Sequence, residues 1–171
     1  MINEENQAAD GIEQNPLRWL ILAGVWLIYF SFGLTVAAMA PLVPAICSDL
    51  EISYGAMGAV LGAWPFVYIL SALPCGMLLD RIGPRKALFV AAAIMALSGF
   101  LRSFSDTYLI MILAVAVFGL GGPLISIGAP KLIAFLFEGK DRGLAMGIYI
   151  TGPGVGAVVA LSITNSFSLP I

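Results

Sequence analysis

Four charged side chains lie within seven positions of one another in an otherwise apolar part of the chain. Residues 76–86 read GMLLDRIGPRK and contain Asp80, Arg81, Arg85 and Lys86. A carboxylate and several cations at this spacing form ion pairs with one another or with neighbouring loops, but they provide no nucleophile and general base for catalysis. Ionised groups are too costly to leave in hydrocarbon. The segment therefore predicts a tight loop at a membrane face, between two helices that cross the membrane.

The glycine and proline residues of this loop predict its geometry. Gly76 is expected to let two helices approach closely, Gly83 to adopt a positive φ, and Pro84 to begin the next helix. Asp80 would lie at the membrane boundary, where an opposite charge or a helix N-terminus stabilises a carboxylate more than it does in bulk water. A simple positively charged inner turn would have a similar composition, and this alternative stays open.

The composition of the chain is that of a membrane protein. Of its 171 residues 60% are hydrophobic and 11% charged, and the mean hydropathy is +1.00; a soluble domain has about 25% charged residues. There is no histidine, which removes the commonest general base and metal ligand. Cys47 and Cys75 have no metal or redox spacing and are expected to pack. We expect no metal, no cofactor and no nucleic-acid partner.

Five stretches are long and apolar enough, or nearly so, to cross about 30 Å of hydrocarbon as helices. The predicted spans are residues 19–40, 54–79, 87–104, 108–137 and 143–166. Pro41 and Pro44 are expected to end the first span, and Ser105 or Asp106 to cap the fourth. The stretches are apolar around their whole circumference, unlike the helices of a soluble protein.

The distribution of lysine and arginine predicts the orientation of these spans. With a cytoplasmic N-terminus, six basic residues fall on the inner side and only Arg102 on the outer side. The six are Arg18, Arg81, Arg85, Lys86, Lys140 and Arg142. We therefore predict that the acidic segment 1–16 is a disordered cytoplasmic tail and that residues 165–171 lie outside.

Small residues mark the fifth span. Gly152 and Pro153 interrupt the helical hydrogen bonding, and the freed carbonyl groups of a membrane helix usually face protein or a cavity. Gly152, Gly156 and Ala160 are spaced four apart, which predicts a face for close helix packing. Generic packing of small residues, without any specific functional motif, would also explain this pattern.

Several polar groups lie inside the predicted spans. Lys131 either extends its side chain to the inner interface or contributes to a gate or solute site. The other candidates for a central cavity are Tyr29, Ser31, Thr35, Trp64, Tyr68 and Tyr149. Hydroxyl groups at such positions often bond only to the preceding helical turn.

The order of these features resembles the major facilitator superfamily of transporters over residues 17–171. The loop matches its G-x3-D-R-x-G-x-R-K signature, and Gly152, Pro153 and Gly156 match its helix-5 motif. The resemblance implies that Asp80 and Arg85 latch the two halves of a closed transporter, with Glu138 as a carboxylate partner of Arg85.

This chain departs from the family pattern at three positions. Pro84 replaces a frequent basic residue, Ala157 replaces a glycine, and Val115 stands where helix 4 usually has an arginine. Gly119 and Gly121 match the rest of that helix-4 motif. Coupling through an arginine of this helix is therefore not expected.

The resemblance predicts an all-α polytopic membrane protein with five transmembrane helices of a six-helix half. It implies the N-terminal portion of a secondary active transporter of the plasma or inner membrane that moves a small solute by alternating access. Its expected partners are the lipid bilayer, the solute with or without a coupling ion, and the missing C-terminal half. Residues 142–156 are most similar to bacterial cyanate- and nitrate-type anion carriers. The alternatives are a non-transporting fragment or assembly partner and, less consistent with the residues, a membrane enzyme.

Overall fold

The computed structural model describes residues 17–168, with side chains as far as 164, so the predicted tail 1–16 lies outside the described residues. Helices connected by short turns make up this part of the chain. They are α2 (Leu17–Asp49), α3 (Tyr54–Ile82), α4 (Pro84–Ser103), α5 (Tyr108–Leu136), α6 (Gly139–Ile150) and α7 (Gly152–Ser168). Within the described residues, five helical stretches are long and apolar enough to cross a membrane, with α6 and α7 together forming the fifth.

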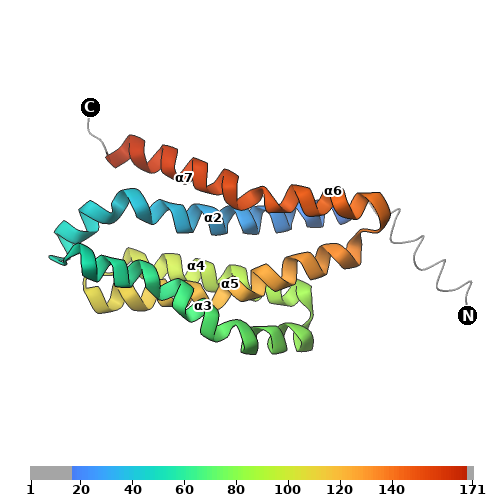
Figure 1. The fold of residues 1–171 in the computed structure, drawn as a ribbon, viewed down its shortest axis with the longest axis horizontal. Coiled ribbons are helices and arrows are strands. Elements are labelled where there is room, and N and C mark those ends of the chain that lie inside the picture. The colour runs from blue at the N-terminus through green and yellow to red at the C-terminus, as the bar shows by residue number, and fades with distance from the viewer. Residues whose placement is uncertain (1–16, 169–171) are drawn as a thin grey trace, which may run out of the picture.

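The helices form two layers (Figure 1). One layer consists of α2 with α6 and α7 alongside it, and the other consists of α3, α4 and α5. Packing is tightest within the layers, where α7 lies along α2 while α3 and α4 lie along α5. Helix α5 has the most buried face of all, which places it at the centre of its layer.

The first helix is longer than predicted. It continues through Pro41 and Pro44 to Asp49, so the expectation that these prolines end the span is wrong. A proline removes one hydrogen bond from a helix but does not by itself end it when the flanking residues stay helical, as in many membrane helices. The turn after the helix includes Glu51 at φ 52°.

The turn between α3 and α4 has the predicted geometry. Gly83 has φ 80°, its N–H donates to the Leu79 carbonyl oxygen at 2.9 Å, and Pro84 is the first residue of α4. The cap of α5 differs from the prediction, because Thr107 rather than Ser105 or Asp106 occupies it. The Thr107 hydroxyl accepts from the Ile110 N–H at 3.4 Å.

Glycines allow the close approach of α5 to its neighbours. A Cβ added at Gly119 would overlap the Trp64 carbonyl group of α3, and one at Gly121 would lie 3.2 Å from the Ala91 carbonyl oxygen of α4. Among the described residues no other helix approaches Gly76 closely, because none of their atoms outside its own helix backbone lies within 4 Å of the position its Cβ would take. Adjacent helical residues point about 100° apart, so Cys75, whose thiol reaches the Leu120 carbonyl oxygen, faces α5 while Gly76 does not.

The small-residue face of α7 packs on α2, as predicted. Gly152, Gly156 and Ala160 are all buried, and a Cβ at Gly152 would lie 2.9 Å from the Trp26 carbonyl oxygen. The predicted span is broken between α6 and α7 at Thr151, just before Pro153. The Trp26 indole N–H donates to the Thr151 hydroxyl oxygen at 3.0 Å, which fixes the break against α2.

Candidate functional site

Most of the described charged residues gather at one end of the helix bundle. At this charged end α2, α4 and α6 begin and α3 and α5 finish (Figure 1). Its charged residues are Arg18, Asp80, Arg81, Arg85, Lys86, Lys131, Glu138, Lys140, Asp141 and Arg142. The opposite end has Asp49, Glu51, Arg102 and Asp106. The loop motif and the predicted gate residues therefore lie together.

Asp80 forms an ion pair with a lysine of α5. The Lys131 Nζ lies 2.7 Å from the Asp80 Oδ1, and their side chains are 51% and 69% exposed. No ion pair joins Arg85 to Glu138 in the described part of the chain, so that expected pairing is not found there. The packing of α3 along α5 brings Asp80 and Lys131 together.

A second ion pair joins α2 to α6. The Arg18 Nη2 lies 2.9 Å from the Asp141 Oδ2. The Arg18 guanidinium also lies 5.3 Å from the Phe137 ring centroid and 5.8 Å from that of Trp19. With only 14% of its side chain exposed, Arg18 is held more firmly than the Asp80–Lys131 pair. Sequence analysis missed this contact because nothing in the order of residues places Asp141 beside a helix that begins more than a hundred positions earlier.

Two predicted cavity residues lie inside the protein where the layers meet. Tyr29 donates through its hydroxyl to the Ile125 carbonyl oxygen at 3.3 Å. Its ring lies edge-on to Tyr149, with centroids 5.0 Å apart. This contact connects α2, α5 and α6, and the structure gives both tyrosines a packing role.

The other two aromatic candidates belong to a group of rings, which we call the aromatic group: Phe32, Trp64, Tyr68 and Phe118. Phe32 stacks on Phe118 at 5.1 Å, and Trp64 meets Phe118 edge-on at 5.9 Å. Trp64 also meets Tyr68 edge-on at 6.4 Å. The group joins α2, α3 and α5, and all its members except Phe118 are partly exposed.

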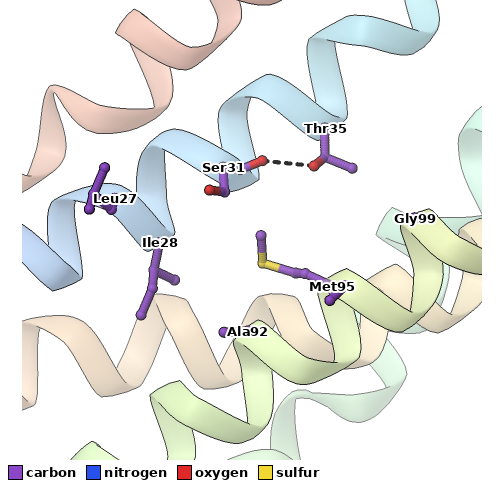
Figure 2. Close-up of a pocket in the computed structure, with 8 residues that line it drawn as sticks. Leu27, Ile28, Ser31, Thr35, Ala92, Met95 and Gly99 are labelled. Carbon is purple, nitrogen blue, oxygen red and sulfur yellow. Dashed lines mark hydrogen bonds between the residues drawn. The ribbon is translucent and has the colours of Figure 1, made fainter.

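Thr35 lines a groove between α2 and α4 (Figure 2). This groove has a volume of about 430 Å³, and Met95 extends into it from α4. The Thr35 hydroxyl donates to the Ser31 carbonyl oxygen at 2.8 Å. This is the bond to the preceding turn that explains such a hydroxyl without a solute.

Arg102 is the charged residue with the most unusual environment. Its guanidinium lies 5.3 Å from the Phe118 ring centroid, and its Nε is buried without a hydrogen-bond partner among the described residues. An arginine in the middle of a membrane helix costs about 2.5–3.5 kcal/mol on insertion scales, less near the helix end, and a cation–π contact offsets about 0.5–2 kcal/mol. One signal was present in the sequence, since Arg102 falls inside the predicted span 87–104 although it was assigned only to the outer side.

Comparison with known proteins identifies the family. Residues 25–169 match the family described as Major Facilitator Superfamily. A probable L-galactonate transporter of Escherichia coli K12 is 31% identical over 128 residues, which are 72% of this chain and 27% of that protein. The gallate transporter of Pseudomonas putida is 28% identical over 86% of this chain and 34% of its own length. Myo-inositol transporter 2 of Schizosaccharomyces pombe is 25% identical over 96% of this chain and 31% of its own length.

The chain thus spans about a third of the length of these relatives. The matched region includes the helix-5 motif and the charged turn between α3 and α4, and it extends over nearly all of the described helices. The chain belongs to the Major Facilitator Superfamily of transporters, as a multi-pass membrane protein.

Proposed function

We propose that this chain is the N-terminal portion of a secondary active transporter that moves a small solute by alternating access. Its N-terminus lies in the cytoplasm, and a C-terminal half completes the solute path. Support for the orientation comes from the charged end, where all the basic residues of the described chain except Arg102 are found. On this assignment the charged end is the cytoplasmic end.

The observation that supports a gate at this end is the exposed ion pair between Asp80 and Lys131. Exposed ion pairs contribute only about 0–1 kcal/mol. Asp80 can therefore exchange Lys131 for a basic partner elsewhere in the transporter at little cost when the cytoplasmic side closes. A weak, exchangeable contact is suited to a gate that must open and close in each transport cycle.

The similar proteins support transport in general more strongly than they support any one class of solute. The relatives named above are called transporters of a sugar acid, an aromatic acid and a neutral polyol. The resemblance of residues 142–156 to cyanate- and nitrate-type carriers is a prediction from the sequence, and it favours an anion. Whether an ion is coupled to the solute stays a prediction of the family resemblance.

The gate is tested with Asp80→Asn in the full-length transporter that contains this chain. This change keeps the size of the side chain and removes its charge. We expect the transport rate to fall by up to about fivefold, the effect of losing an ion pair of up to about 1 kcal/mol on a two-state gate, while solute binding is retained. Asp106→Asn removes an exposed carboxylate at the opposite end and is the matched control. If Asp80→Asn abolishes binding instead, Asp80 is a solute ligand and the gate assignment is wrong.

A further inference from the structure

Arg102 directs its charge toward the middle of the bundle. It lies in the last turn of α4, at the end opposite the charged end. Side chains of an α-helix lean toward its N-terminus, which for α4 is at the charged end. The guanidinium accordingly reaches Phe118, which is in the third turn of α5 and 1% exposed. An arginine that served only the outer interface would extend the other way.

The guanidinium has hydrogen-bond donors that the described residues leave unused. Arginine has five N–H donors, yet no hydrogen bond or ion pair of its side chain is formed within residues 17–164. Asp106, the carboxylate nearest to it in the sequence, is exposed and does not pair with it. The ring of Phe118 contacts the cation but does not accept hydrogen bonds from these N–H groups as an oxygen atom would.

The ring that the cation contacts belongs to the aromatic group, whose other rings offer surfaces suited to the rest of a small molecule. Phe118, whose ring contacts the Arg102 guanidinium, stacks on Phe32 and contacts Trp64. Binding sites for small molecules typically combine such apolar and aromatic walls with a few polar groups that fix orientation. An arginine supplies two parallel N–H bonds to a carboxylate, which gives both strength and direction.

We propose that Arg102 binds the carboxylate of a small organic acid carried by the transporter. The inference rests on the proposed transport function and names its solute class. Phe118 holds the guanidinium at the edge of the aromatic group, whose partly exposed rings contact the body of the acid. A lipid phosphate offers the same oxyanion chemistry, so the experiment must separate the two sources.

The experiment uses the full-length transporter in vesicles of phosphatidylcholine alone and of phosphatidylcholine with phosphatidylglycerol. Uptake of gallate, L-galactonate and neutral myo-inositol is measured for the wild type, Arg102→Gln and Arg102→Lys. The matched control is Arg142→Gln, which removes an exposed arginine outside the proposed site. Thermal unfolding in detergent checks that each variant is folded.

We expect Arg102→Gln to raise the half-saturation concentration for the acid at least tenfold in both lipid mixtures. Arg102→Lys should raise it less, because it keeps the charge but not the planar pair of donors. Arg142→Gln should leave it within about twofold, as expected for removing an exposed charge. If Arg102→Gln does not fold, the comparison of Arg102→Lys with the control decides the question.

Four outcomes would overturn the assignment. An unchanged half-saturation concentration for the acid in a folded Arg102 variant shows that Arg102 is not a ligand. A defect seen only with phosphatidylglycerol shows that Arg102 binds lipid phosphate. Uptake of myo-inositol without uptake of either acid contradicts the solute class but leaves the transport function standing. Uptake of none of the three solutes by the wild type contradicts the transport function itself, and with it the solute class.

Discussion

Gly156 provides the most direct test of how α7 is held against α2. A Cβ at this position would overlap the Phe30 carbonyl oxygen and would lie 2.9 Å from the Leu34 nitrogen. Both contacts are with backbone, which cannot rotate away as a flexible side chain can. In Gly156→Ala the helices must therefore separate, and a gap of about 0.5–1 Å already removes a quarter to a half of the dispersion attraction at the contact.

The size of the effect follows from two opposing terms. Overpacking of this kind costs about 1–3 kcal/mol, whereas replacing glycine by alanine within a helix gains up to about 1 kcal/mol. Gly154→Ala isolates the second term, because no described atom outside its own helix backbone lies within 4 Å of the added Cβ. We therefore expect Gly156→Ala to be less stable than Gly154→Ala by about 1–3 kcal/mol.

The measurement is unfolding of the chain in mixed micelles by increasing dodecyl sulfate, followed by far-ultraviolet circular dichroism. Comparing two alanine variants on the same helix cancels the helix-propensity term. Equal stability of Gly156→Ala and Gly154→Ala would refute the close backbone contact between α2 and α7.

Two other predictions concern the core and the orientation. Ser98 is 0% exposed and donates to the Ala114 carbonyl oxygen at 2.7 Å, so Ser98→Ala should lower the free energy of unfolding by about 0.5–1.5 kcal/mol. Ser103→Ala, at an exposed serine on the same helix, should leave the free energy of unfolding unchanged. Equal effects of the two substitutions would contradict the role of the buried bond. A phosphatase that is active only outside the cytoplasm should be active when fused after Ile171 and inactive when fused after Lys86; the reverse pattern would show that the proposed orientation is inverted.

The sequence by itself determined the helices and their membrane character. Uninterrupted apolar stretches admit few structures other than membrane helices, because backbone polar groups in hydrocarbon must be satisfied within the chain. The turn at Gly83 and Pro84 was predictable for a local reason, since glycine tolerates a positive φ and proline favours the first position of a helix. The close packing of Gly152 and Gly156 also followed from their spacing.

Only the tertiary structure decided which charged residues meet. Asp80 pairs with Lys131, fifty-one positions away, and Arg18 pairs with Asp141, more than a hundred positions away. Such pairs depend on which helices are neighbours and how each is rotated about its axis, and uniformly apolar helices carry little information on either. The same rotation turned Gly76 away from its neighbours and directed Arg102 inward to Phe118. Spacing along the chain fixed the elements, whereas helix packing fixed the partners of their charges.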